Sequence, residues 1–260
     1  MLMCPPDFFR IEYEINPWMS LKNPADQIRA RKQWDQLYKV IEETLQVKVD
    51  LLDPQPGHPD LVFTANAGLV SGKRVWVSNF KYPERQGEQT FFREWFSRNG
   101  YEVITVPPEL AFEGEGDFLR MGSLLFAGAP FRTDLSSHIF ISKELQCEVI
   151  SLELIHPKFY HLDTCFCPLN DRSALFVPDA FSPSSLKILT ACIDHLIPLK
   201  TAEADLFSAN AIVSGNKIIF QRGAETTRKK LENEGFEVFP VDLSEFIKAG
   251  GSAKCLVLWI

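Results

Sequence analysis

Four short segments, far apart in the sequence, carry side chains whose types suit nucleophilic chemistry. They are FTAN at 63–66, FEGEGD at 112–117, HLDT at 161–164 and KAGGSAKC at 248–255. A cysteine thiolate is a strong nucleophile, and it works with a nearby general acid or base such as a histidine. Cys255 is a candidate nucleophile because it follows a Gly-Gly-Ser turn, although a cysteine that opens a buried strand has the same local sequence.

Composition narrows the classes of partner. The chain has 260 residues, a formal net charge of -7 and 45% hydrophobic residues, which is enough for a sizeable core. The acidic balance argues against nucleic acid and anionic membranes and favours a small cationic substrate. The sequence shows neither an apolar run of transmembrane length nor a signal peptide, so we expect a cytoplasmic protein. A homo-oligomer is compatible with these features.

The cysteines favour a reduced protein without a metal or cofactor. Six cysteines, none in a CxxC pair, are too few for a disulfide scaffold of this length. His161, Cys165 and Cys167 are spaced unlike any common zinc site, and alternation along a strand explains the two cysteines better. We therefore expect neither a metal site nor a cofactor.

An internal repeat organises the chain. DLVFTANAGLVSGKRVWVS, from Asp60, and DLFSANAIVSGNKIIFQ, from Asp205, share Asp-Leu, Ala-Asn-Ala, an apolar run, a Ser-Gly turn and a second apolar run. This pattern is typical of a β-hairpin. Looser copies begin at Asp117 and Asp163. A helical pattern and a short apolar strand follow each copy, so the sequence predicts four β-β-α-β units.

The two ends of the chain are expected to complete a fifth unit. A helical pattern near the N-terminus, with Asn23 as its N-cap and Pro24 at its first helical position, precedes the strand VKVDLL. The C-terminal segment CLVLWI would pair with residues near 8–13. Ends that complete one unit imply a closed ring without exposed sheet edges. We therefore predict a single α/β domain over residues 1–260, a ring of five units, with two separate α/β domains as the alternative.

Closure of the ring would bring the loops that open the hairpins to one pole. These loops carry acids, amides, one histidine, a Gly-Gly-Ser turn and one cysteine: Asp60, Asn66, Glu113, Glu115, Asp117, His161, Asp163, Asp205, Asn210, Gly250, Gly251, Ser252 and Cys255. Such a set is expected of a cysteine nucleophile with a general acid or base in a pocket for a cation.

The four segments resemble motifs of the guanidino-group-modifying superfamily, which includes arginine deiminases, dimethylarginine dimethylaminohydrolases, glycine amidinotransferases and arginine dihydrolases. FTAN resembles the family's FTRD or FVED, FEGEGD its EGGD, HLDT its HxD and GGSAKC its GG-x-x-x-C. The resemblance spans nearly the whole chain. It implies the family's five-bladed α/β propeller with pseudo-fivefold symmetry, and hydrolysis of a linear amidine through an amidino-thioether intermediate.

The resemblance implies a catalytic role for four residues. Cys255 would attack the guanidinium carbon, and His161 would protonate the leaving group and then activate water. Asp163 and Glu113 would hold the guanidinium through paired hydrogen bonds. Glu115 is the alternative to Glu113, because FEGEGD contains one residue more than EGGD.

The resemblance also implies a set of substrate-binding residues. Arg85 and Arg132 would receive the α-carboxylate of the substrate, and Asn16, in INPWM, would contact its amino-acid end. The backbone at Gly251 and Ser252 would stabilise the tetrahedral centre. The remaining members are Asp60, Asn66 and Asp117, of which Asp117 would orient its neighbours.

Asn66 determines which reaction we expect. Deiminases and dimethylargininases carry Asp at this position, whereas an Asn amide can donate to the oxygen of a bound citrulline. FTAN, INPWM and FEGEGD resemble the arginine dihydrolase branch, which converts arginine to ornithine, two ammonia and carbon dioxide. The alternatives are a single hydrolysis of arginine or methylarginine to citrulline, an arginine-binding propeller without activity, and a glycine-dependent transferase.

Overall fold

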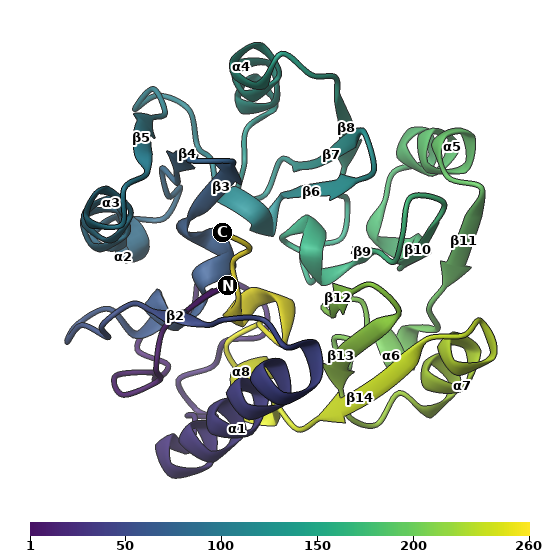
Figure 1. Cartoon of the computed structure of the whole chain (residues 1–260), viewed down its shortest axis with the longest axis horizontal. Helices are drawn as coiled ribbons and strands as arrows, with labels where there is room; N and C mark the ends of the chain where they lie inside the picture. Colours follow the sequence, from purple (N-terminus) through teal and green to yellow (C-terminus); the bar gives the residue numbers. More distant parts are fainter. The chain divides into compact units, whose positions relative to one another are not determined.

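The computed structural model describes residues 1–260 (Figure 1). These residues divide into two compact units. The first unit combines both ends of the chain, Met1–Ala65 and Leu199–Ile260, and the second runs continuously from Asn66 to Pro198. Both are α/β structures built from small sheets of two or three strands. None of the helices has the length and apolar character needed to cross a membrane.

The continuous unit contains three copies of the predicted β-β-α-β pattern. The first comprises β3 (Gly68–Ser71), β4 (Arg74–Val77), the short α2 (Pro83–Gln86), α3 (Glu88–Arg98) and β5 (Glu102–Thr105). The second comprises β6 (Phe118–Met121), β7 (Leu124–Ala129), α4 (Leu135–Leu145) and β8 (Val149–Glu153). The third comprises β9 (Phe166–Pro168), β10 (Ser173–Phe176), α5 (Pro183–Cys192) and β11 (His195–Pro198). In each copy, an antiparallel hairpin is extended by a parallel third strand.

Apolar side chains at strand and helix spacing hold these copies together. Trp76 of β4 and Phe118 of β6 are fully buried and belong to one core cluster, which Ile141 of α4 joins. Phe92 and Phe96 lie four residues apart on α3 and are also buried, as expected of one face of an amphipathic helix. Each site motif is therefore attached to a packed sheet rather than to a long loop.

The unit formed by the two chain ends holds the fourth copy of the repeat. This copy comprises α6 (Thr201–Ala204), β12 (Ile212–Ser214), β13 (Lys217–Gln221), α7 (Glu225–Asn233) and β14 (Glu237–Val241). The same unit contains β1 (Leu2–Met3), α1 (Gln27–Val40), β2 (Asp50–Leu51) and α8 (Ser244–Ile247). β1 pairs with β2 in parallel and bridges to Leu258, so the N- and C-termini lie side by side (Figure 1).

Two predictions about the chain ends were wrong. The C-terminal segment pairs with Leu2 rather than with residues near 8–13. β1 ends at Met3, and Pro5 and Pro6 lack the backbone N–H groups that would extend it. The first helix is capped by Asp26 rather than Asn23, and the Asp26 carboxylate accepts from Ile28 N and Arg29 N, each at 3.0 Å. Asp26 also donates its backbone N–H to Glu245 of α8, which fixes the start of the helix.

Each of the four motifs lies in a single turn of 3₁₀ helix. These turns are Thr64–Ala67, Gly114–Gly116, Leu162–Thr164 and Lys254–Leu256. The first three each lead into the first strand of a hairpin, and the fourth leads into the segment that bridges to β1. A tight turn anchored by a strand keeps the side chains that it carries in fixed directions.

Candidate active site

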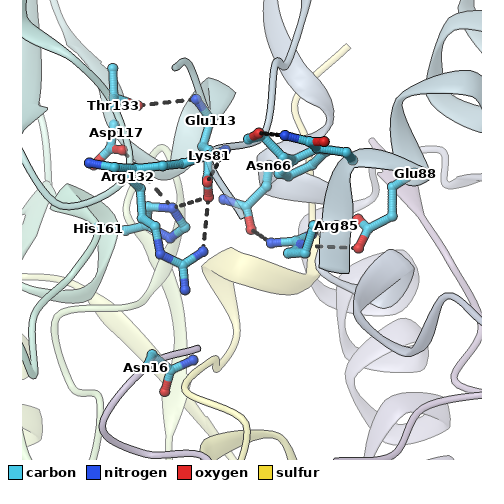
Figure 2. Close-up of polar contacts among 12 residues, drawn as sticks. Asn16, Asn66, Lys81, Arg85, Glu88, Glu113, Asp117, Arg132, Thr133 and His161 are labelled. Carbon is cyan, nitrogen blue, oxygen red and sulfur yellow. Dashed lines mark hydrogen bonds and ion pairs between the residues drawn. The ribbon is translucent and has the colours of Figure 1, made fainter. Parts of the chain in front are cut away.

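Glu113 is the centre of a buried charge cluster in the continuous unit (Figure 2). Its Oε2 accepts from His161 Nε2 at 2.8 Å and from Arg132 at 3.2 Å, and its Oε1 accepts from Lys81 N at 3.3 Å. Burial by itself raises the pKa of Glu113, but the charge of Arg132 and the contact with His161 outweigh burial and lower it to about 2. Glu113 is therefore an anion at neutral pH, whereas its competitor Glu115 is half-buried in the adjoining turn.

Arg132 is held by two aromatic rings as well as by Glu113. The guanidinium carbon lies 4.5 Å from the ring centre of Tyr82 and 4.7 Å from that of Tyr160. A planar cation stacked on aromatic faces keeps its charge and its orientation when water is excluded. The sequence did not single out either tyrosine, although each stands next to a predicted segment, Tyr82 in YPER and Tyr160 before His161.

Asp117 supports the turn that carries His161 and Asp163. Its Oδ1 accepts from Leu162 N at 3.1 Å, and its Oδ2 lies 4.0 Å from His161 Nε2. Burial raises the pKa of Asp117 to about 6 against the opposing charge of His161. Asp163 lies one residue beyond Leu162 and is buried as well.

Asn66 and Arg85 form a second buried cluster in the same unit (Figure 2). Arg85 makes two hydrogen bonds to Glu88, at 2.9 and 2.7 Å, and donates to Asn66 Oδ1 at 2.8 Å. Glu88 therefore compensates the charge with which Arg85 was expected to bind a carboxylate. The sequence contains a signal for this pair, because Glu88 follows Arg85 by three residues and the two can meet on one helical face.

The amide nitrogen of Asn66 is a buried donor without a hydrogen-bond partner. Because a guanidinium only donates, Oδ1 must face Arg85, and the NH₂ end of the amide points the other way. Gly116 packs directly against that nitrogen, with which a Cβ at position 116 would clash, and such a Cβ would also lie 3.3 Å from the ring of His161. The absence of a side chain at Gly116 therefore leaves room for the amide of Asn66.

Cys255 lies in the unit formed by the two chain ends and is 3% exposed. Asn210 donates from Nδ2 to Cys255 Sγ at 3.1 Å, and its Oδ1 accepts from Cys255 N at 3.1 Å. Upstream, Gly251 packs against the ring of Phe63 so closely that a Cβ would clash, and Ser252 is fully buried. The Gly-Ser turn is thus shaped by packing. From the sequence, Asn210 is expected among the residues at the pole, but no role is predicted for it.

Asn16 and Asp60, two predicted substrate ligands, lie in the same unit as Cys255. Asn16 donates to Ala249 O at 3.1 Å and accepts from Trp18 N and Met19 N, so its amide ties the INPWM segment to the residue before the Gly-Gly pair. Asp60 is 1% exposed and lies in the 3₁₀ turn Pro59–Val62.

The cysteines that follow His161 do not form part of a metal-binding group. Cys165 Sγ lies 3.5 Å from Leu162 O, and burial raises the pKa of Cys165 well above its usual value. The structure contains no group of three or more His, Cys, Asp or Glu side chains arranged to hold a metal ion.

The family model described as eukaryotic N,N dimethylarginine dimethylhydrolase matches residues 12–260. The chain belongs to this family. The predicted resemblance to the guanidino-group-modifying superfamily is therefore confirmed. The similar proteins include arginine dihydrolases, which places this dimethylargininase-family chain in the arginine dihydrolase branch of that superfamily.

The bifunctional arginine dihydrolase/ornithine cyclodeaminase AgrE of Nostoc sp. is 45% identical over 99% of this chain. The chain spans 37% of the length of AgrE. The N(G),N(G)-dimethylarginine dimethylaminohydrolase of Mycobacterium tuberculosis is 40% identical, with 99% of this chain and 84% of that protein covered. The N-terminal domain of ArgZ, an arginine dihydrolase from the ornithine-ammonia cycle in cyanobacteria, has been solved as a cysteine-to-serine variant bound to substrate. It superposes with a TM-score of 0.95 at 45% identity, over 99% of this chain and 96% of that one.

Proposed function

We propose that this chain hydrolyses free L-arginine to ornithine, two ammonia and carbon dioxide, with Cys255 as the nucleophile. Membership of a family whose named relatives are arginine dihydrolases and dimethylarginine dimethylaminohydrolases supports an enzyme that acts on amidine C–N bonds. The buried amide of Asn66 is the observation that favours two successive hydrolyses over a single one.

The first hydrolysis releases one ammonia. The Cys255 thiolate forms a C–S bond to the guanidinium carbon, and the C–N bond to one terminal nitrogen breaks as His161 gives that nitrogen a proton. Water then adds to the amidino-thioether as His161 takes a proton back, and the C–S bond breaks to give citrulline and the thiolate. Glu113, which is ionised and hydrogen-bonded to His161, stabilises the imidazolium and with Asp163 holds the cation.

The second hydrolysis requires citrulline to stay in place, and Asn66 supplies a reason for this. Its NH₂ group is buried, has no hydrogen-bond partner in the protein and can donate to the ureido oxygen. An aspartate at position 66 has no such hydrogen and would repel that oxygen. Attack by Cys255 on the ureido carbon expels the second ammonia, and hydrolysis of the thioester-like adduct leaves a carbamate that decomposes to ornithine and carbon dioxide.

The remaining residues take supporting roles in this proposal. Arg132, stacked between two tyrosines, receives the α-carboxylate of the substrate. Arg85 orients Asn66, to whose Oδ1 it donates, and its charge is paired with Glu88 as that of Arg132 is paired with Glu113. Asp117 holds the turn that carries His161. Asp60, Asn16, Gly251 and Ser252 complete the substrate-binding set.

We also propose that the repeated sheets are blades of the five-bladed α/β propeller and that residues 1–260 form one catalytic domain. The four β-β-α-β copies and the pairing of the two chain ends support this arrangement. A cytoplasmic location and assembly into a homo-oligomer stay predictions from composition.

A single hydrolysis of dimethylarginine is the second candidate. The 40% identity to the dimethylarginine dimethylaminohydrolase of M. tuberculosis supports it. That reaction would stop at citrulline and release dimethylamine, and it makes no use of the open amide donor of Asn66.

A product assay distinguishes the candidates. Purified protein is supplied with arginine or dimethylarginine, and ornithine, citrulline, ammonia and dimethylamine are quantified against time. Dihydrolysis gives two molecules of ammonia per ornithine without lasting citrulline. Citrulline that accumulates with one ammonia per arginine contradicts the dihydrolase proposal and leaves the single-hydrolysis candidate standing. Binding of arginine without any ammonia release contradicts both.

A further inference from the structure

The side chain of Asn210 contacts Cys255 at both ends of its amide group. Nδ2 lies 3.1 Å from Cys255 Sγ, and Oδ1 lies 3.1 Å from Cys255 N. The backbone oxygen of Asn210 also accepts from Lys254 N at 3.3 Å. Asn210 is fully buried, so these contacts are made where water competes little.

The chemistry of the partners determines which way this amide points. A backbone N–H group only donates, so the atom facing Cys255 N is Oδ1, and the donor end must face the sulfur. An N–H donor stabilises a thiolate more than a neutral thiol, because the acceptor then carries a full charge. The contact thus orients the sulfur and favours its reactive form.

The turn before Asn210 is built to hold it in place. Phe207 has a φ of 56°, a left-handed backbone that is uncommon for a residue with a side chain. Its carbonyl accepts from Asn210 N at 2.9 Å, and its ring packs on Trp18 with centroids 4.6 Å apart. The surrounding packing therefore maintains an unfavourable turn that directs Asn210 towards Cys255.

We infer that Asn210 is a positioning residue, which orients the Cys255 sulfur and stabilises its thiolate through the Nδ2–H···Sγ hydrogen bond. The inference rests on the proposed cysteine chemistry, but the state of the thiol can be measured without any turnover. When Cys255 loses its proton to solvent or base, the hydrogen bond from Asn210 remains on the sulfur and becomes charge-assisted.

The test measures how fast iodoacetamide alkylates Cys255 as a function of pH, in the absence of arginine. Trypsin cleaves after Lys254, so mass spectrometry reads Cys255 in a peptide separate from the other cysteines. The variants are Asn210→Asp, which keeps the acceptor but replaces the donor by an anionic oxygen, and Asn210→Ala, which removes both groups. The matched control is Ser208→Ala, which removes a buried hydrogen bond to Glu203 O in the same turn.

The midpoint of alkylation should rise in the order wild type and Ser208→Ala, then Asn210→Ala, then Asn210→Asp, the last by at least about one pH unit. Steady-state kinetics should show a lower kcat with little change in KM, because Asn210 contacts the nucleophile. If circular dichroism shows that Asn210→Asp does not fold, the shift in the alkylation midpoint of Asn210→Ala tests the inference alone. Unchanged midpoints in the Asn210 variants, or an equal shift in Ser208→Ala, overturn the inference even if the enzyme hydrolyses arginine. If the alkylation midpoints follow the predicted order but no variant or wild-type protein hydrolyses arginine, the inference about Asn210 is supported and the proposed function is contradicted.

Discussion

Asn66 and Asn210 occupy the same place in two copies of the repeat, in the Ala-Asn-Ala triplets at 65–67 and 209–211, yet their amides have different partners. Asn66 accepts from the side chain of Arg85 and keeps its NH₂ group free of hydrogen bonds. Asn210 accepts from the backbone of Cys255 and directs its NH₂ group at the sulfur of the same residue. One amide therefore has a donor without a partner in the protein, and the other directs its donor at the sulfur of the proposed nucleophile.

The comparison shows how one repeated side chain can serve two purposes. In both copies, a group that only donates, a guanidinium or a backbone N–H, takes the amide oxygen and thereby fixes the direction of the nitrogen. The repeat supplies a buried asparagine before a strand in each case. The neighbour that each asparagine meets decides what its donor does.

The largest effect is expected when the partner of Asn210 is changed. Cys255→Ser should lower the release of ammonia from arginine at least about a thousandfold, because a serine hydroxyl next to the same amide is a far weaker nucleophile. Ammonia release is measured at saturating arginine. Cys192→Ser, at an exposed cysteine, is the control and should keep full activity. Comparable activity of the two variants contradicts the role of Cys255.

The next largest effect is a loss of stability when Glu88, which pairs with Arg85 beside Asn66, is changed. Glu88→Gln leaves the buried guanidinium of Arg85 without its carboxylate, and should reduce the free energy of unfolding by about 3 kcal/mol. Urea denaturation followed by circular dichroism measures this loss. Glu84→Gln makes the same chemical change at an exposed site of α2 and should cost little. Equal stability of the two variants would show that the Arg85–Glu88 pair does not support Asn66.

A pH-dependent effect is expected at Asp117, which follows the Gly116 that packs on Asn66. Burial raises the pKa of Asp117 from 3.8 to about 6, so the folded state binds the proton more tightly than the unfolded state. Stability from this group is complete below the lower of these pKa values and is lost as pH rises through the higher one, by roughly 2–3 kcal/mol. Asp117→Asn should remove this slope while keeping the acceptor for Leu162 N.

Urea midpoints between about pH 4 and about pH 7 test this prediction. The opposite behaviour is expected of Glu113, whose pKa is lowered from 4.5 to about 2, so its contribution is lost as pH falls through that range. A wild-type slope between about pH 4 and about pH 6 that persists in Asp117→Asn would assign the titration to another group.

The smallest change in free energy is expected at Asn66 itself, although it changes the product. Asn66→Asp keeps an oxygen for Arg85 and loses the donor, so the second hydrolysis should slow at least about tenfold and citrulline should accumulate. The initial rate of ammonia release from arginine serves as the internal control, since the first hydrolysis does not need that donor. If Asn66→Asp forms ornithine as fast as the wild type, the NH₂ group of Asn66 is not needed for the second hydrolysis, and the proposed contrast with Asn210 is contradicted.

Much of the site was predictable because it rests on local patterns. Two hairpins of the repeat appear where Ser-Gly turns separate two apolar runs, the looser copies turn at Gly122 and at Asn170-Asp171, and the structure confirms β-β-α-β units around all four. The preference for Glu113 over Glu115 came from a motif, and the contact with His161 supports it. Local patterns also misled, since Asn23 with Pro24 is an acceptable helix start, yet Asp26 caps the helix because it also contacts Glu245 of α8.

By itself, the amino-acid sequence determined the repeated units, the buried faces of their helices and strands, and the four turns that carry the reactive side chains. Only the tertiary structure decided that Glu88 compensates Arg85, that Asn16 is tied to Ala249, and which way each asparagine amide points. The reason is the distance along the chain between partners: Asn66 takes its direction from a residue 19 positions away, and Asn210 from one 45 positions away. Spacing within a helix or strand records neighbours within a few residues, whereas the direction of a hydrogen bond depends on whichever donor the fold brings to it.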